Sequence, residues 1–135
     1  MAELYTVRAY AKDVDQAPRK VSLVASLVRG RSVADALVIL SHTPKRSALP
    51  LVKVIESARA NAANNHGIDT KTLVISTLSV TTGSRIKRFH PASRGRALPF
   101  EKKASNILVE VTGDLKPKKT PSKPAAETTV KEEEK

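Results

Sequence analysis

The sequence predicts an α+β domain, in which three helices pack on a small three-stranded antiparallel sheet in the order β-α-α-α-β-β and a long β-hairpin protrudes. Three observations lead to this prediction. Alternating apolar residues mark strands near both ends of the first 113 residues, helical apolar spacing occupies the middle, and a basic segment without a core pattern separates the last two strands. The length of 135 residues fits one such domain with an extension.

The first strand is expected over residues 4–11, where Tyr5, Val7 and Ala9 alternate with more polar positions. The first helix follows, and its start is indicated by Asp13, Asp15 and Pro18. Gly30 predicts its end. Its apolar positions have helical spacing: Val21, Val24, Leu27 and Val28.

The second and third helices complete the predicted helical layer. Ser32 followed by Asp35 is a capping-box pattern and opens the second helix, which is expected to bury Val33, Ala36, Leu37 and Leu40. The third helix is expected to open at Thr43-Pro44, to be kinked near Arg46 by Pro50, and to end at Gly67. Its apolar stripe is Leu51, Ile55, Ala58 and Ala62.

The last two strands are expected over residues 72–81 and 106–111. A change of phase between Ile75 and Leu78 predicts a bulge. Apolar patterning stops after Val80 and resumes at Ile107, so residues 81–104 or so form a hairpin beyond the core, with turns near residues 90–93 and again at Gly95. About ten extended residues per arm would project about 30 Å. Because such a hairpin is marginal alone in water, we expect a polyanion to surround it.

Charge is concentrated on this hairpin. The chain has 24 Lys and Arg against 13 Asp and Glu, a net charge of +11 and a pI near 10.2, which calls for a polyanionic partner. Residues 82–103 hold seven basic residues and one acid, Glu101. Arginine binds phosphate with two hydrogen bonds, and rings near the turn can stack on unpaired bases. For Phe89, a hydrophobic contact across the hairpin is an equal alternative. The predicted hairpin contacts are Arg85, Lys87, Arg88, Phe89, His90, Arg94, Arg96, Lys102 and Lys103.

Residues 1–113 form the predicted domain and carry a net charge of +10. Residues 114–135 are rich in Lys, Pro and Glu with only two large aliphatic residues, so we expect a disordered tail. Within the domain, a second basic cluster flanks the first helix and extends along the third. Its members are Arg8, Lys12, Arg19, Lys20, Arg29, Arg31, Lys45, Arg46 and Arg59.

Catalytic and cofactor chemistry is not expected. The absence of cysteine excludes a disulfide framework, a cysteine–zinc site and a thiol nucleophile. The three histidines share no metal-ligand spacing, and no phosphate loop, nucleophile elbow or carboxylate pair is present. We therefore expect no enzyme activity, no metal, no cofactor and no small-molecule substrate. The longest apolar run, residues 36–40, is too short to span a bilayer, and the first residues lack a secretory signal pattern, so we expect a cytoplasmic protein without membrane contact.

Three segments resemble a known family. They are APRKVSLVASLVRG at 17–30, VIESARANAANN at 54–65, and RIKRFHPASRGRA at 85–97 followed by NILVEV at 106–111. In order and spacing, from about residue 5 to 112, the chain is similar to the bacterial large-subunit ribosomal protein twenty-two family. One position departs from the family motif: Ala92 stands where a basic residue is usual.

The resemblance implies a structural constituent of the large ribosomal subunit in the cytoplasm. It implies binding to large-subunit (23S) rRNA, a role in early assembly, a globular domain near the nascent-chain exit, and a hairpin that lines the peptide exit tunnel. The implied partners are 23S rRNA, neighbouring large-subunit proteins and the nascent polypeptide. On the domain, the implied rRNA contacts are the second basic cluster together with Asn61 and Asn64 of the third helix.

Two other classes of function fit parts of the sequence. An architectural DNA-binding protein can also project basic β-arms, and that alternative predicts a dimer with affinity for bent duplex. A membrane-surface binder would need a basic amphipathic helix with bulky apolar anchors. The predicted helices lack aromatic residues, which disfavours the membrane alternative.

Overall fold

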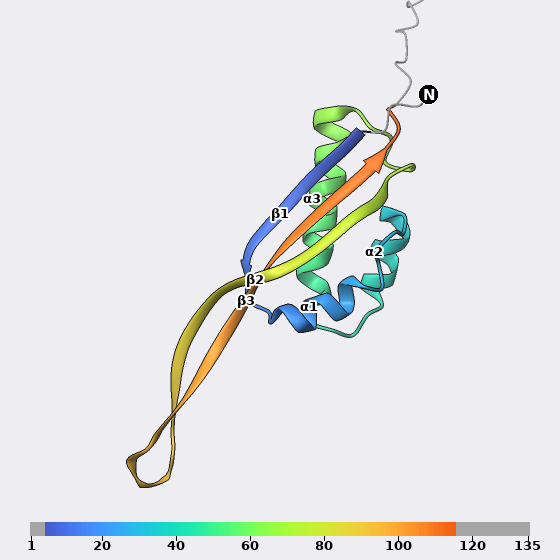
Figure 1. The fold of residues 1–135 in the computed structure, drawn as a ribbon. Helices are drawn as coiled ribbons and strands as arrows, with labels where there is room; N and C mark the ends of the chain where they lie inside the picture. The colour runs from blue at the N-terminus through green and yellow to red at the C-terminus, as the bar shows by residue number, and fades with distance from the viewer. Residues whose placement is uncertain (1–4, 116–135) are drawn as a thin grey trace, which may run out of the picture.

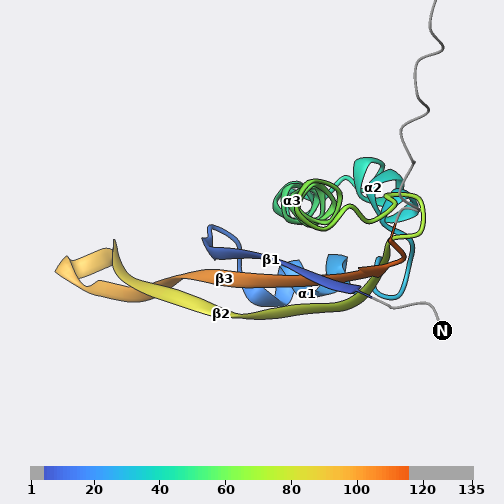
Figure 2. The same ribbon diagram turned by 90° about the horizontal axis from the view of Figure 1, so that it is seen from above.

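In the computed structural model, which describes residues 5–115, three helices and a three-stranded sheet form the predicted α+β fold (Figure 1). The strands are β1 (Tyr5–Val14), β2 (Val74–Pro91) and β3 (Ala97–Gly113). The helices are α1 (Pro18–Ala25), α2 (Val33–Ser41) and α3 (Ala48–His66). Figure 2 shows α2 and α3 on one side of the sheet, with the far ends of β2 and β3 extending away as a hairpin.

The sheet is antiparallel with β3 in the centre, in the order β1-β3-β2. Pairs such as Val7↔Val111 and Ile75↔Val111 align the inward residues of all three strands. The bulge predicted from the phase change is confirmed, because the β2–β3 register shifts between Ile75 and Thr77. This shift returns Leu78 to the buried face.

The core is aliphatic, as expected for a chain with four aromatic residues. Inward strand residues meet the apolar stripe of α3, in which Leu51, Ile55, Ala58 and Ala62 have no exposed surface. The two alanines allow α3 to lie close along β1 and β3. No residue of the predicted hairpin belongs to this cluster, since its last buried members on the tip side are Leu78 and Ile107, with Val80 partly buried against it.

The first helix is shorter than predicted. It ends at Ala25, and the following N–H groups of Leu27 and Val28 bond carbonyls three residues back instead of four. Leu27, predicted to be in the apolar stripe, is 48% exposed as a result. The chain then runs beside β2, where the Gly30 N–H donates to the Ile75 carbonyl at 3.2 Å. Gly30 has φ 70°, the left-handed backbone conformation that glycine adopts readily. It ends the turns that follow α1 and not the helix itself.

The second helix begins as predicted, because the Ser32 side chain accepts a hydrogen bond from the Asp35 N–H at 3.1 Å. The prediction for the start of the third helix is wrong. Helix α3 begins at Ala48, not at Thr43-Pro44, and it ends before Gly67 as expected. Pro50 therefore lies in the first turn, where its nitrogen has no helical hydrogen bond to lose, and the predicted kink is not needed.

The hairpin strands are longer than the apolar pattern indicated. His90 and Pro91, predicted to lie in the turn, still pair with Leu98 and Ala97. The turn itself spans residues 92–96, with left-handed backbone at Arg94 (φ 58°) and Gly95 (φ 71°).

At the other end of β3, the first two residues of the predicted tail pair with the segment after α3. The Asp114 carbonyl accepts from the Asp69 N–H at 3.0 Å, and Leu115 forms a β-bridge with Ile68. The remainder of that tail, residues 116–135, lies outside the described residues. No helix within residues 5–115 is long and apolar enough to cross a membrane.

Candidate nucleic-acid interface

The hairpin presents cations on both of its faces. Pairing runs from Arg85↔Lys103 to Pro91↔Ala97, so odd-numbered residues of the two arms share one face and even-numbered residues share the other. Arg85, Lys87 and Lys103 lie on the first face, and Arg88 and Lys102 lie on the second. Residues 84–91 and 97–103 are all exposed, which leaves both faces open to a ligand that surrounds the hairpin.

Two of the hairpin cations have acidic neighbours. An Arg85 guanidinium nitrogen lies 4.0 Å from a Glu101 carboxylate oxygen, and Lys102 Nζ lies 3.1 Å from Asp15 Oδ2. All four side chains in these pairs are more than a third exposed, so the pairs are weak and can be exchanged for phosphate. The other predicted hairpin cations form no ion pair with a carboxylate of residues 5–115: Lys87, Arg88, Arg94, Arg96 and Lys103.

Of the three rings near the turn, two stack on each other and the third is exposed. The His90 and Phe100 rings stack with centroids 3.9 Å apart and an angle of 12° between their planes. This pair forms the contact across the hairpin that the sequence allowed for Phe89. Phe89 itself lies opposite Pro99 and is 67% exposed. Phe89 is therefore the more accessible ring for stacking on a base, and one face of the His90 ring is already covered.

The base of the hairpin and the start of α1 form one cationic hollow. Arg19 and Lys20 lie in the first turn of α1, and Arg85 and Lys103 form the first pair of the hairpin beyond the sheet. All four line the same depression, together with Ala17, Pro18 and Thr82. The sequence placed these cations in two separate clusters, and the fold brings them together.

A second hollow extends this surface toward α3. Lys20 also lines a depression with Lys45 and Arg46, two cations of the segment before α3. Lys20 lines both hollows, so the two hollows adjoin at this residue. We call the six predicted contact residues that line them the cationic corner: Arg19, Lys20, Lys45, Arg46, Arg85 and Lys103. Gathering like charges in concave surface raises the local positive potential and favours a polyanion.

Four predicted contacts lie elsewhere and have partners within the chain. Arg29 Nε donates to the Leu78 carbonyl at 3.0 Å, and Arg31 Nε donates to the Leu27 carbonyl at 2.9 Å. Arg8 pairs with Glu110 at 2.7 Å on the sheet face opposite the core. On that same face the Lys12 ammonium lies 5.8 Å from the centre of the Tyr10 ring. Each of these four side chains thus has a partner within the chain, and all four residues are exposed.

The predicted residues of α3 are also outside the corner. Asn61 donates to the Arg8 carbonyl at 3.4 Å and so joins α3 to β1. Arg59 and Asn64 are exposed on the helix surface.

Sequence reasoning missed a group of residues where the hairpin leaves the sheet. Asp13, assigned there to the start of a helix, lies instead at the end of β1, and its carboxylate accepts a hydrogen bond from the Ser84 N–H at 2.9 Å. This bond lowers the pKa of Asp13 below its ordinary value of 3.8. Gly83, two residues beyond the predicted strand, was the available signal for a bulge or close backbone approach at this point.

Within residues 5–115 no three His, Asp or Glu side chains gather in a way that could hold a metal ion.

The comparison with protein families covers nearly all of the described fold. The sequence model of the family described as ribosomal protein L22p/L17e matches residues 9–112, which run from the middle of β1 to the end of β3 and include all three helices and the whole hairpin.

Proposed function

The chain belongs to the ribosomal protein L22p/L17e family and is a structural component of the large ribosomal subunit in the cytoplasm; from that premise we propose that it binds 23S rRNA through its cationic corner and hairpin. The observation that carries the proposal is the gathering of predicted contact residues in the corner. Six cations from α1, the segment before α3 and the base of the hairpin surround two adjoining hollows, a shape and charge suited to a folded phosphate backbone.

The hairpin continues this surface outward. Its two open faces suit a ligand that encloses it on several sides, as folded rRNA does. The exposed arginines can bind phosphate with two hydrogen bonds, and Phe89 can stack on an unpaired base. The arms leave the core at residues 84 and 104, and eight or nine extended residues per arm reach about 25–30 Å.

The family resemblance supports three finer proposals. We propose that the hairpin tip at residues 92–96 lines the peptide exit tunnel and faces the nascent polypeptide. The helical side of the domain then lies near the tunnel exit beside neighbouring large-subunit proteins. Binding to several rRNA segments at once, through the corner and the hairpin, suits a protein that joins the subunit early in assembly. In this proposal the protein has no catalytic role, since its contribution is to hold RNA in place.

A sedimentation experiment and a comparison of two binding affinities test the proposal. The tagged full chain should co-sediment with large subunits at about one copy each when lysate is fractionated on a gradient. The purified chain should bind 23S rRNA more tightly than duplex DNA at the same salt concentration. A chain found chiefly on the chromosome, or one that prefers bent duplex DNA and forms a dimer, would overturn the proposal in favour of the architectural alternative.

A further inference from the structure

The hairpin begins where the three-stranded sheet becomes two-stranded, and both pairings with β3 change register at that point. Ser105 of β3 pairs with Val14 on one side and with Thr82 on the other. The β1 pairing shifts between Ala11 and Val14, and the β2 pairing shifts between Thr82 and Arg85. Each outer strand therefore carries an extra residue at the root of the hairpin, and such bulges bend and twist a strand.

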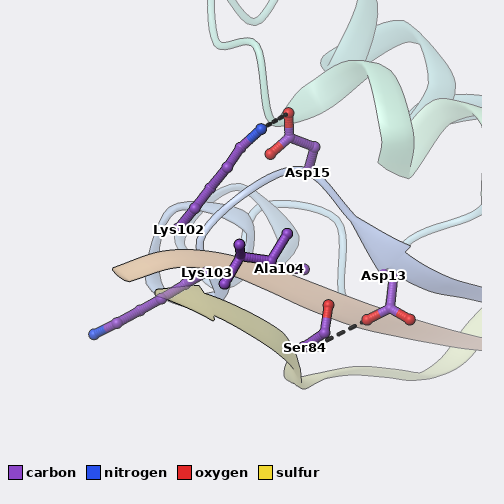
Figure 3. A pocket seen from close by; sticks show the side chains of 7 residues that line it. Asp13, Asp15, Ser84, Lys102, Lys103 and Ala104 are labelled. Atoms are coloured by element: carbon purple, nitrogen blue, oxygen red, sulfur yellow. Dashed lines mark hydrogen bonds and ion pairs between the residues drawn. The ribbon is translucent and has the colours of Figure 1, made fainter. Parts of the chain in front are cut away.

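Asp13 joins these two bulges. Its N–H donates to Asn106 Oδ1 on β3 at 2.8 Å. Its own Oδ1 accepts from the Ser84 N–H on β2 at 2.9 Å, the bond that Figure 3 shows. Strands β1 and β2 are not neighbours in the sheet, so this side chain links two outer strands across the central one. The backbone at Asp13 has φ 49°, a conformation that Asp, Asn and Gly tolerate best.

Gly83 makes the same link sterically possible. A Cβ at this position would lie 2.9 Å from Asp13 Oδ1 and 3.2 Å from Asn106 Oδ1. It would also lie 3.2 Å from the backbone carbonyl carbon of Ala104, which cannot rotate away as a side chain can. The close approach of the two bulges thus depends on a glycine at position 83 as well as on a hydrogen-bond acceptor at position 13.

A second tie at the root is weaker. Lys102 and Asp15 form an ion pair at 3.1 Å, and both residues line the same hollow as Asp13 and Ser84 (Figure 3). Both side chains are more than half exposed, and an exposed pair of this kind contributes little to fixing a geometry. The two hydrogen bonds at Asp13 are exposed as well, but each is donated by a backbone N–H. They therefore act on the strand backbones at the bulges, whereas the ion pair joins only two side-chain ends.

We propose that Asp13 is a positioning residue that fixes the direction in which the hairpin leaves the sheet. Arg85 and Lys103 are the first hairpin pair beyond the bulges, and they share a hollow with Arg19 and Lys20 of α1. A fixed exit direction therefore assembles the cationic corner in the free protein. The benefit of this arrangement rests on the proposed function, because a preorganised surface loses less conformational freedom when rRNA binds.

The free full-length chain provides the test, without RNA. It has no cysteine, so cysteines introduced at Ser93 in the tip and at Ser57 on α3 are the only labelling sites for a distance measurement by electron spin resonance. In the D13G variant, glycine tolerates the positive φ but removes the acceptor. The D13N variant keeps the acceptor oxygen. The matched control D15N removes only the exposed ion pair.

We expect the distance distribution of D13G to be roughly twice as wide as that of the parent chain, since its hairpin samples more directions. D13N and D15N should retain the narrow parent distribution, and G83A should broaden it as D13G does. An unchanged distribution in D13G would overturn the proposal. Loss of the cooperative thermal transition in D13G would also overturn it, because Asp13 would then stabilise the domain as a whole.

The outcome is separable from that of the proposed function. If the parent chain failed to bind 23S rRNA, the proposed function would fail while the distance distributions of the free protein still decided the role of Asp13. If rRNA binds, D13G should have lower affinity than D13N, by about tenfold, because its hairpin must be ordered on binding. Equal affinities for the two variants would contradict the preorganisation step.

Discussion

Removing the four cations of the α1–hairpin hollow should weaken rRNA binding in a salt-dependent manner. The perturbation is the combined variant R19Q/K20Q/R85Q/K103Q, which removes the four charges and leaves a polar side chain with a hydrogen-bond donor at each position. All four residues are exposed, so the fold should be retained. If each cation neutralises one phosphate, each contributes about 0.7 to 0.9 to the slope of log affinity against log salt concentration. The variant should therefore have a slope shallower by about 3.

The assay is the binding of a 23S rRNA fragment to the full chain at several salt concentrations. Between 50 and 200 mM salt, a slope difference of about 3 means that the parent chain loses about 60-fold more affinity than the variant. The control is K71Q, which neutralises one exposed cation in the segment after α3, outside the corner and the hairpin. A slope that is unchanged in the quadruple variant, with the thermal transition intact, would refute the assignment of this hollow to phosphate binding.

Four further predictions concern the fold and the hairpin. Leu51 has no exposed surface, so L51A should lower the free energy of unfolding in urea by about 2–5 kcal/mol through the cavity it leaves. Replacing residues 86–95 by a short glycine-containing turn should leave the thermal midpoint of the free protein nearly unchanged, and a large fall would show that the hairpin belongs to the core. The Ser105 hydroxyl is buried without a hydrogen-bond partner among the described residues, so S105A should be neutral or should raise stability by up to about 1–3 kcal/mol in the same urea assay; clear destabilisation would reveal a bond to the hydroxyl. Because the pKa of Asp13 is lowered in the folded protein, its bond to Ser84 should stabilise the root fully above the unfolded-state pKa and be lost as pH falls through the folded-state value. The Ser84 amide resonance should follow that titration, and D13N should abolish it.

The sequence predicted those parts of the fold that depend on local patterns. The Ser32 cap and the Gly67 helix end are determined by residues a few positions apart. The register shift after Ile75 follows from alternation within one strand. The start of α3 was wrong because Pro44 and Pro50 are both compatible with a first helical turn, and the sequence pattern does not choose between them.

The candidate interface was predicted as residue types but not as one surface. The excess of arginine and lysine on the hairpin is visible in the sequence, whereas the presence of Lys20 and Arg85 in one hollow depends on how the hairpin leaves the sheet. That direction depends on contacts between residues 71 positions apart, Asp13 and Ser84. A pattern of alternating apolar residues contains no information about such a contact, and an aspartate before a helix has a simpler local explanation.

The positions of the hairpin root and of the cationic corner are linked by the register of β3. Ser105 is the last residue of β3 that pairs with both outer strands, and Lys103 is the next β3 residue toward the tip on the same face. A bulge displaced by one residue along β2 would turn Arg85 to the opposite face of the hairpin, because side chains alternate along a strand. Lys103 would then have no cationic neighbour from β2 in the hollow that it shares with Arg19 and Lys20. The extra residue at Gly83-Ser84 therefore does more than bend the strand: it determines which hairpin cations face α1, and Asp13 accepts its hydrogen bond from that extra residue.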